Sequence, residues 1–577
     1  MKVILAENAG FCMGVRRAVE TTLDMVRKND KIATFGPLIH NPQVLGLLEE
    51  RGVEILREIP DYRDGAIIIR AHGVPPESKA KLRSTGAEIH DATCPRVLKV
   101  QAIIRKHQKD GFATVIIGDR NHAEVDGLLG FAGETGQVVS SVEEARSLEL
   151  SSPYIIVSQT TQDDKSFALL STIILERFPG GLVFNTICDS THKRQAAVLA
   201  LCGRVEAMVV VGGRSSANTR RLAELVEKTG CPVHLVETEE ELDPESFKQY
   251  NCVGVTAGAS TPSWLINRAI QFLESIPGRD ESRFGSMLGR LIGYLMASNL
   301  YVGVGGGLLA CAVALLLDES VKFTTFMLVA GYLFSMHNLN RFIGSETGRF
   351  SDPVREKFRH KFRRPVLALS WAALSVSLLV AYLYEDFSFP VLAVMSVLGV
   401  LYSVRFIPRR VSSFIKVRRL KEIPGSKTFF VAMAWAFVII VVPYGGSGKG
   451  LAASTVGAFL FVLFLVYVRG ALYDVFEVQG DRIAGKETLP VCIGQAKTMR
   501  LLYGLIVVLA LLPLAGIVAG LLPLVWLGLL PPPFYLFAVA ARYDRGLIPY
   551  SPKLEFAVDS IFPLTAGLIF LVNILNP

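Results

Sequence analysis

The sequence predicts two fold classes in one chain: an α/β region of parallel sheets, followed by an all-α bundle of membrane helices. Residues 1–280 alternate short apolar runs with charged helical stretches, whereas long apolar stretches dominate residues 281–577. Hydrophobic residues make up 51% of the chain and charged residues only 19%, which is more apolar than is usual for a soluble protein. We therefore expect two domains, residues 1–280 and residues 281–577.

The apolar runs of the first domain have the composition of buried parallel strands, and most are followed by a helical pattern. They are KVILA, GAIIIRA, ATVIIGD, PYIIVSQ, GLVFNT, AMVVVGG and CVGVTAG. These strands are too many for one mononucleotide-binding unit, and the sequence has neither GxGxxG nor GxxxxGK[ST] to cradle a nucleotide phosphate. We expect several small α/β units around a shared centre.

Three cysteines occupy equivalent places, where a strand gives way to a helix. Cys12 lies in AENAGFCMGVRRAVE, Cys94 in HDATCPRVLKV and Cys188 in FNTICDSTHKRQ. A helix N-terminus with basic residues nearby lowers the pKa of a thiol and favours the thiolate that binds metal. From spacing alone, three unrelated core cysteines are the alternative, since single cysteines are commonly buried and inert. The irregular spacing of the eight cysteines predicts reduced thiols rather than a disulfide framework.

Polar residues follow the other predicted strands. His40, His72 and His122 lie in loops, and Glu124 comes two residues after His122. Hydroxyl and amide side chains cluster in SQTTQDD, GGRSSANTRRL and TAGAST. Imidazoles, hydroxyls and helix N-termini suit a diphosphate, and the carboxyl of Glu124 can carry a proton.

Together these segments resemble the LytB (IspH) family, the 4-hydroxy-3-methylbut-2-enyl diphosphate reductases of the methylerythritol phosphate pathway. The resemblance covers about residues 1–278 and rests on GFCMGVRRAV, GPLIHNPQV, AHGV, DATCP, NTIC…RQ, SSANTRRL and GVTAGAS. It implies three α/β units around a [4Fe–4S] cluster, with Cys12, Cys94 and Cys188 as ligands. Three cysteines leave one iron open for the allylic hydroxyl of the substrate.

The resemblance also implies roles for the polar residues. Glu124 matches the proton carrier, and Thr160 matches a threonine near the substrate hydroxyl. The positions that match diphosphate-binding residues are His40, His72, His122, Ser216, Asn218 and Ser260. The implied reaction uses electrons from a donor such as ferredoxin or flavodoxin and yields isopentenyl and dimethylallyl diphosphates. The alternatives are a hydrolytic cluster enzyme of the aconitase kind and a redox-sensing cluster module on a non-catalytic membrane anchor.

The second domain contains about nine apolar stretches of the roughly 20-residue length that crosses a bilayer. They lie near 296–317, 323–343, 366–384, 388–407, 428–444, 451–471, 501–519, 523–541 and 556–575, with the seventh and eighth running together. Basic residues follow the even-numbered stretches, which predicts a protein of the bacterial inner membrane with a cytoplasmic first domain. The formal charge of +8 is accordingly attributed to a membrane surface and not to nucleic acid. The GVGGG run at 303–307 predicts close helix packing.

Acidic residues at the end of the sixth stretch predict a second site. In RGALYDVFEVQGDRIAGKETLPVCIG, the spacing of Asp474, Glu477 and Asp481 places them on one helical face near the cytosolic surface. Such acids can hold Mg²⁺ against a prenyl diphosphate, or they can pair with Arg482 and Lys486 at a solvated helix end. The stretch is similar to the second aspartate motif of the UbiA prenyltransferase superfamily, which implies a membrane domain that handles prenyl diphosphates.

The first motif of that superfamily, an asparagine followed at four and eight residues by aspartates, is incomplete in this chain. Counting from Asn340 gives Gly344 and Gly348, and counting from Asn338 gives Phe342 and Glu346. Two hypotheses follow: prenyl transfer that uses Glu346, or a scaffold or prenyl-binding role without transfer.

Overall fold

The computed structural model describes most of the chain and divides it into two compact units, Met1–Asp280 and Glu281–Pro577. The residues outside the description are 27, 29–30, 152, 344–352, 385–387, 404–425, 447–451, 484–487, 549 and 576–577.

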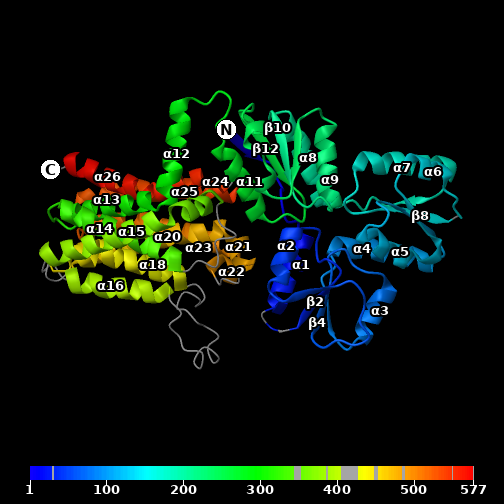
Figure 1. Ribbon diagram of the computed structural model, residues 1–577, viewed down its shortest axis with the longest axis horizontal. Coiled ribbons are helices and arrows are strands. Elements are labelled where there is room, and N and C mark those ends of the chain that lie inside the picture. Colours follow the sequence, from blue (N-terminus) through cyan, green and yellow to red (C-terminus); the bar gives the residue numbers. More distant parts are fainter. Residues whose placement is uncertain are drawn as a thin grey trace. The chain divides into compact units, whose positions relative to one another are not determined.

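The first unit contains three four-stranded sheets whose strands all pair in parallel (Figure 1). Sheet A has the order β1-β12-β10-β11, with β1 (Lys2–Leu5), β12 (Cys252–Ala257), β10 (Ala207–Val211) and β11 (Val233–Val236). Sheet B has the order β3-β2-β4-β5, with β3 (Val53–Leu56), β2 (Ile32–Phe35), β4 (Ala66–Ile69) and β5 (Glu88–Asp91). Sheet C has the order β7-β6-β8-β9, with β7 (Gly136–Val139), β6 (Ala113–Ile117), β8 (Tyr154–Ser158) and β9 (Leu182–Val183). The predicted architecture of small parallel-sheet units is confirmed.

Helices connect the parallel strands, as crossover connections require. They are α1 (Met13–Val26), α2 (Pro42–Glu49), α3 (Pro76–Ser84), α4 (Pro95–Lys109), α5 (Ala123–Ala132), α6 (Val142–Ser147), α7 (Asp164–Arg177), α8 (Asp189–Cys202), α9 (Ala217–Glu227), α10 (Pro244–Phe247) and α11 (Ser263–Ser275), with short 3₁₀ turns at Gly133–Thr135 and Glu239–Glu241. Sheet A is built from both ends of the unit, and the Met1 amino group donates to the Ile276 carbonyl over 2.7 Å.

All seven apolar runs form strands, and the strands expected before His40 and Cys94 form as β2 and β5, but the sequence pattern missed β3, β7 and β11. The three missed strands lie at sheet edges, where one side is open and the composition is mixed, as in the GQVV of β7. The inner strands are apolar on both faces because helices cover both, and every residue of β4 and β8 is buried.

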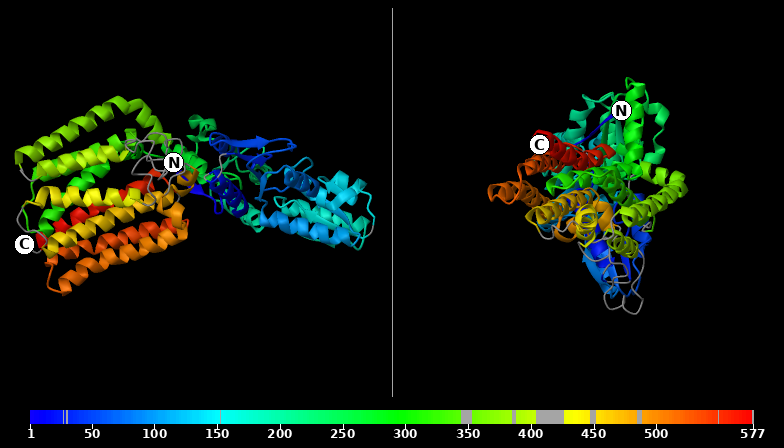
Figure 2. Two further views of the ribbon diagram at one scale, coloured as in Figure 1. Left: turned by 90° about the horizontal axis from the view of Figure 1, so that it is seen from below. Right: turned by 90° about the vertical axis from the view of Figure 1, so that its left-hand side faces the viewer.

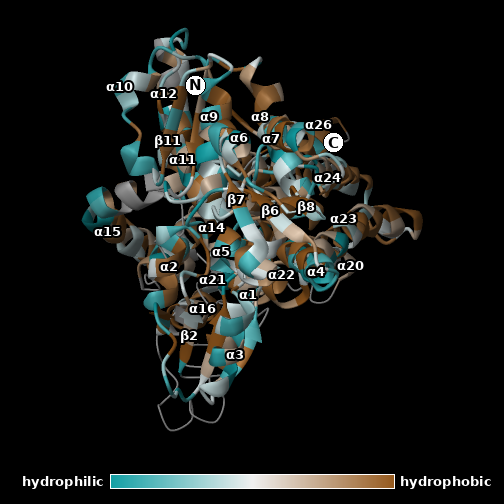
Figure 3. Cartoon of the chain, turned by 90° about the vertical axis from the view of Figure 1, so that its right-hand side faces the viewer, coloured by the Kyte–Doolittle hydropathy of each residue, from teal (hydrophilic) through white to brown (hydrophobic). Residues whose placement is uncertain are grey.

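The second unit is a helical bundle whose long helices lie side by side (Figure 2). Its helices are α12 (Arg283–Ala297), α13 (Leu300–Leu316), α14 (Phe323–Ile343), α15 (Pro353–Tyr384), α16 (Ser388–Ser403), α18 (Ser426–Ala436), α19 (Val442–Tyr444), α20 (Ala453–Phe476), α21 (Val478–Ile483), α22 (Leu489–Ile493), α23 (Gln495–Val518), α24 (Pro531–Asp544), α25 (Pro552–Asp559) and α26 (Ile561–Leu575), with a π-helical turn at Phe437–Val441 and a 3₁₀ turn at Leu524–Leu529. Figure 3 shows α23 in the brown of hydrophobic residues, whereas α10 of the first unit is largely teal.

The predicted count of nine spans is not confirmed. Within the described residues, five helices are long and apolar enough to cross a membrane, or six if the bent pair α12 and α13 counts as one span. The predicted first span is broken at Ser298–Asn299, and Ser388–Val400 and Thr428–Tyr444 are shorter apolar helices. The seventh and eighth stretches are separate, because α23 ends at Val518 and the next turn begins at Leu524. Most of the basic loop after the fourth stretch lies outside the described residues.

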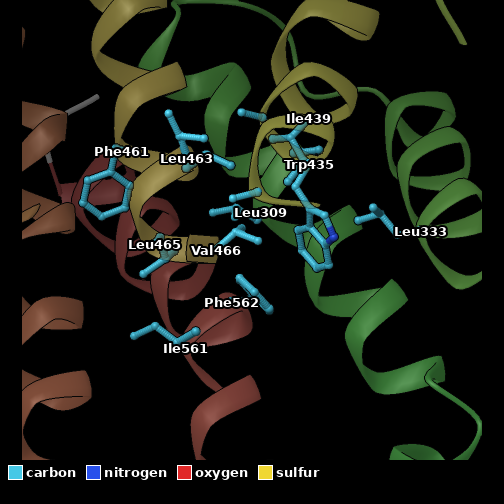
Figure 4. Close-up of a cluster of buried hydrophobic side chains, with 14 of the residues drawn as sticks. Leu309, Leu333, Trp435, Ile439, Phe461, Leu463, Leu465, Val466, Ile561 and Phe562 are labelled. Atoms are coloured by element: carbon cyan, nitrogen blue, oxygen red, sulfur yellow. The ribbon is translucent and has the colours of Figure 1, made fainter. Parts of the chain in front are cut away.

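The bundle core is close-packed around aromatic residues (Figure 4). Trp435 stacks on Phe562 with ring centroids 4.9 Å apart, and both side chains are buried. A Cβ at Gly306 would lie 2.3 Å from Leu333 Cδ1, so the glycine run of α13 lets α14 approach closely. The predicted packing role of this run is confirmed.

Candidate functional site

Each of the three candidate ligand cysteines stands at the start of a helix. Cys94 is the N-cap of α4, Cys188 is the N-cap of α8, and Cys12 directly precedes α1. The backbone N–H of Val15 donates to Cys12 Sγ over 3.5 Å. A Cβ at Gly14 would lie only 2.4 Å from Cys94 Sγ, so the glycine lets the start of α1 pack directly against that thiol.

A single cavity of the first unit gathers every residue that the sequence assigned to the reductase site. It is lined by Cys12, His40, His72, Cys94, His122, Glu124, Thr160, Cys188, Ser216, Asn218 and Ser260, among others. Cys12 follows β1, His40 follows β2 and His122 follows β6, so strands of all three sheets end at this cavity. The carboxyl ends of parallel strands are where α/β folds commonly bind ligands.

The three histidines form one compact cluster. Their ring centroids lie 4.6 to 5.5 Å apart, and each offers a ring nitrogen within 4.8 Å of the others. Burial lowers the pKa of His40 and His72 and brings the pKa of His122 down to about 4. The imidazoles are therefore neutral at pH 7 in the ligand-free protein. Nδ1 of His122 accepts the backbone N–H of Glu124 over 3.1 Å, which leaves Nε2 as the donor toward the cavity.

Buried polar atoms without partners point to an absent polar ligand. His40 Nε2, His72 Nδ1 and Asn218 Nδ2 are buried and have no hydrogen-bond partner, although such groups nearly always have one. Ser216 is the N-cap of the 11-residue helix α9, and its side chain makes no capping bond. Three side chains and one helix N-terminus are thus available to an anion in the cavity.

Glu124 is held deep in the cavity wall with only 2% of its surface exposed. Its carboxylate accepts the Thr160 N–H over 2.7 Å and the Thr160 hydroxyl over 2.9 Å. Burial raises the pKa of Glu124, and the two bonds from Thr160 act in the opposite direction. The Thr160 carbonyl in turn accepts the N–H of Cys188 over 2.9 Å. Thr160 therefore links Glu124 to Cys188, one of the three candidate ligand cysteines.

The expectation that helix N-termini lower the thiol pKa values does not hold for Cys94. Burial raises the pKa of this thiol, and the neighbouring Cys12 and Cys188 raise it further, whereas the backbone N–H groups of Arg96 and Val97 lower it. The N–H groups at the start of α4 do lower the pKa of Cys94, but in the metal-free chain the loss of solvation raises it by more.

Sequence reasoning missed Arg194 of α8, whose side chain is 2% exposed and lines the same cavity. Its Nε donates to the Asn8 carbonyl over 3.0 Å and its Nη2 to the Gly10 carbonyl over 2.7 Å. Both Asn8 and Gly10 have positive φ, so this guanidinium fixes an unusual loop that leads into Cys12. Arg194 is the arginine of the NTIC…RQ segment, and that motif was the sequence signal that could have identified it.

The acids of the second unit do not share one continuous helix, which corrects the predicted arrangement. α20 ends at Phe476, Glu477 is its C-cap, and α21 begins at Val478. Asp474 and Asp481 are buried, with 3% and 2% exposed, so the interpretation as a solvated helix end is wrong for these two residues. Asp474 accepts the Thr428 hydroxyl over 2.5 Å, and Glu477 accepts the Tyr550 hydroxyl over 3.4 Å.

Asn338 of α14 has a structural role in this unit. Its amide donates to the carbonyls of Ser298 and Phe334, each over 3.0 Å, and its oxygen accepts the Asn299 amide over 2.9 Å. Of the other positions of the incomplete motif, Asn340 and Phe342 lie in α14. Gly344, Glu346 and Gly348 lie outside the described residues, as does Lys486.

Comparisons with known proteins separate the two halves. The model of the LytB protein family matches residues 3–274, and that of the UbiA prenyltransferase family matches residues 291–547. A 4-hydroxy-3-methylbut-2-enyl diphosphate reductase of Geobacter metallireducens is 42% identical over 279 residues, covering 48% of this chain and 98% of the relative. The chain belongs to the LytB family and carries a UbiA-family membrane domain, so it is an integral membrane protein.

Solved structures are similar to each half. The E-1-hydroxy-2-methyl-but-2-enyl-4-diphosphate reductase of Plasmodium falciparum is 28% identical with a TM-score of 0.44, covering 46% of this chain and 85% of that one. A UbiA homologue of Archaeoglobus fulgidus, bound to GPP and Mg²⁺, is 18% identical with a TM-score of 0.37, covering 48% of this chain and 99% of that one.

The cavity residues fit the iron–sulfur cluster that the LytB family implies. All eight cysteines of the chain are free thiols, and three of them line the cavity beside a buried guanidinium. Thiolates are the usual ligands of iron–sulfur clusters, and helix N-termini and Arg194 offset their negative charge.

Proposed function

We propose that the first unit catalyses the reductive dehydroxylation of 4-hydroxy-3-methylbut-2-enyl diphosphate. The observation that carries the proposal is the convergence of three free thiols, a buried carboxyl and an unsatisfied imidazole cluster in one cavity. The reaction breaks the allylic C–O bond with two electrons and two protons. One proton completes the departing water, the other ends on carbon, and the products are isopentenyl and dimethylallyl diphosphates.

In this proposal Cys12, Cys94 and Cys188 hold a [4Fe–4S] cluster. When bound, such a cluster supplies electrons and an open iron site as a Lewis acid for the substrate hydroxyl. A ferredoxin- or flavodoxin-like donor delivers the electrons. Glu124 carries a proton to the hydroxyl, since burial favours its protonated form and Thr160 fixes its orientation.

The remaining cavity residues bind the diphosphate. His40, His72 and His122 donate from their ring nitrogens, and the start of α9 donates through Ser216 and Asn218. Ser260 occupies the same wall, where its hydroxyl donates to the His40 carbonyl over 3.0 Å. It therefore positions the His40 loop as well as facing the ligand.

The direct test is anaerobic purification of the full chain followed by incubation with the diphosphate substrate and a one-electron reductant. The expected result is loss of substrate with formation of both isomeric products. A chain that carries a cluster but leaves the substrate unchanged would favour the redox-sensing alternative.

We also propose that the first unit faces the cytoplasm, because basic residues follow the even-numbered apolar stretches.

For the membrane unit, we propose that it binds a prenyl diphosphate with Mg²⁺ held by Asp474, Glu477 and Asp481. Two of these acids are buried at a helix break, and carboxylates brought together out of water need a cation or hydrogen bonds to offset their repulsion. Incubation of membranes with labelled prenyl diphosphates and a lipid extract tests for transfer. A labelled lipid product would establish transferase activity, whereas magnesium-dependent binding without product would leave a binding role.

A further inference from the structure

Helix α12, which opens the second unit, presents an exposed apolar face. Phe284, Met287, Leu288, Leu291 and Tyr294 are 71%, 59%, 44%, 51% and 54% exposed. Their spacing of three and four residues places them along one side of the helix. Large apolar side chains gathered on one exposed face mark an interaction surface.

The direction of α12 is fixed at the corner between α12 and α13, which is the turn at Ser298 and Asn299. The helix is bent by 75° from α13, which continues the chain into the bundle. Asn299 takes a left-handed conformation with φ of 58° at the turn. Asn338 holds the corner by donating to the Ser298 carbonyl and accepting from the Asn299 amide, over 3.0 and 2.9 Å. α12 therefore runs almost perpendicular to α13.

α12 is too short to cross the bilayer itself. Its 15 residues, at about 1.5 Å each, extend roughly 22 Å, against about 30 Å for the hydrocarbon core. Arg290 lies at the edge of this face, four residues before Tyr294, and Gly289 and Gly293 lie on the opposite side of the helix. A short helix with large apolar side chains on one face and a basic residue at its edge is suited to the interface plane.

Basic side chains surround the same end of the bundle. The ring of Tyr294 lies 5.8 Å from Phe358 and 6.5 Å from Phe362 at the start of α15. α15 has non-helical geometry at Phe362, and its membrane-spanning part begins at His360. The exposed basic residues beside this kink are His360, Lys361, Arg363 and Arg364. Clusters of Lys and Arg at the end of a membrane helix attract anionic lipid headgroups.

We propose that α12 lies in the lipid interface, with Phe284, Met287, Leu288, Leu291 and Tyr294 buried in the outer acyl region and the basic residues of α15 bound to anionic headgroups. The lipid surface is the occupant because α12 continues directly into α13, an apolar helix of the membrane bundle, and the nearby charge is positive. The helix thereby fixes the membrane-side end of the connection to the first unit. This inference is independent of any catalytic activity of either unit.

The test uses the full chain in vesicles of phosphatidylcholine with phosphatidylglycerol as the minor lipid. The photocrosslinker p-benzoylphenylalanine is incorporated at Leu291, on the apolar face, or at Gly289, on the opposite side, where the space around a Cβ is open. After irradiation, lipid adducts are expected to form severalfold more from position 291 than from position 289. Equal yields, or crosslinks from 291 to residues 1–280 or to a second copy, would overturn the interface placement.

A second arm of the experiment tests whether the basic residues of α15 bind anionic headgroups. Phosphatidylglycerol is expected to be enriched among the adducts of position 291 above its share of the bilayer. The double substitution Arg363→Gln and Arg364→Gln should return that enrichment toward the bilayer share while the total lipid yield stays similar. Absence of enrichment in the unsubstituted chain would overturn the role of anionic headgroups.

Discussion

At the scale of single residues, the contact between Glu124 and Thr160 organises the reductase site. The carboxylate is buried and accepts two hydrogen bonds from one residue, whose carbonyl then accepts the N–H of Cys188. Burial favours the protonated carboxyl, and the threonine fixes where that proton points. In our proposal other residues bind the diphosphate, so proton transfer and affinity are separable.

Glu124→Gln should separate these two properties. Glutamine keeps the shape and can still accept the Thr160 N–H, but it cannot deliver a proton. We expect turnover to fall by a factor on the order of 10²–10⁴, with diphosphate affinity similar, measured by single-turnover kinetics and calorimetry. Glu143→Gln, at the start of α6 away from the cavity, is the matched control. Loss of affinity at unchanged turnover would contradict the role of Glu124.

The histidine cluster predicts that diphosphate binding takes up protons. The imidazoles are neutral in the free protein because burial lowers their pKa values, to about 4 for His122. A bound anion favours the charged imidazolium and raises these pKa values, so affinity should increase as pH falls from the bound pKa toward about 4. Calorimetry in buffers of different ionisation enthalpy, at a pH between about 4 and the bound pKa, should show proton uptake by the protein.

The corresponding control is His122→Asn, which should reduce the proton uptake. His234→Asn, in sheet A and outside the cavity lining, should leave it unchanged. Proton release on binding, or uptake that is unaffected by His122→Asn, would contradict this account.

Residue types at strand ends were predictable from the sequence, whereas most of their contacts were not. His40, His72 and His122 were identified because each follows an apolar run. Arg194 was missed because its role depends on two carbonyls more than 180 residues away in the chain. Asn338 likewise belonged to a motif pattern, but its two hydrogen bonds to the α12–α13 corner emerge only from the fold.

At the scale of elements, helix termini define both candidate sites. Cys94 and Cys188 cap α4 and α8, and the break at Glu477 separates Asp474, near the end of α20, from Asp481 in α21. The cysteine positions were predictable because strand-to-helix turns are local signals. The helix break was not predictable, because a spacing of three and four residues describes an unbroken helix equally well.

The cysteine set predicts which substitutions remove the cluster. Cys12→Ser, Cys94→Ser or Cys188→Ser should abolish the brown absorbance and the reductase activity, because the three thiols face one cavity. Cys202→Ser, at the C-terminal end of α8, should preserve both. Absorbance and iron content of anaerobically purified protein provide the measurement. Equal effects at all four positions would refute the ligand assignment.

Arg194 connects two elements, and its removal should loosen the loop between β1 and α1. A hydrogen bond to a charged group contributes about 1.5–3 kcal/mol, so Arg194→Met should speed local opening by at least about tenfold. Amide hydrogen exchange at Gly10 to Cys12 in the cluster-free chain measures this directly. Lys193→Met, the exposed neighbour, should leave exchange unchanged. Unaltered protection in Arg194→Met would show that the loop is held by other contacts.

At the scale of the whole molecule, the chain joins a soluble-type α/β unit to a membrane bundle, each with its own core. The composition change near residue 280 was visible in the sequence, and the two compact units divide at Asp280. The first unit makes five-carbon prenyl diphosphates in our proposal, and the second belongs to a family of prenyltransferases. The two proposed sites use different chemistry, thiolates in one and carboxylates in the other, so they can be inactivated independently.

The acids of the membrane unit provide that independent test. Asp474 and Asp481 are buried, and Asp474 already accepts the Thr428 hydroxyl, so a cation between them would complete their coordination. We expect prenyl diphosphate binding to require Mg²⁺ and to weaken by at least about tenfold in Asp474→Asn or Asp481→Asn, since each replaces a charged ligand by a neutral one.

Reductase activity should survive in both variants, because it depends on the first unit alone. Asp318→Asn, an exposed acid after α13, should preserve both properties and so serves as the matched control. Equilibrium binding of a labelled prenyl diphosphate, with and without a chelator, is the measurement. If binding is independent of magnesium and unchanged in the two aspartate variants, the acids are structural and the bundle recognises the diphosphate by other groups. If reductase activity falls with binding, the two sites are coupled, and the independence argued from their separate cores is wrong.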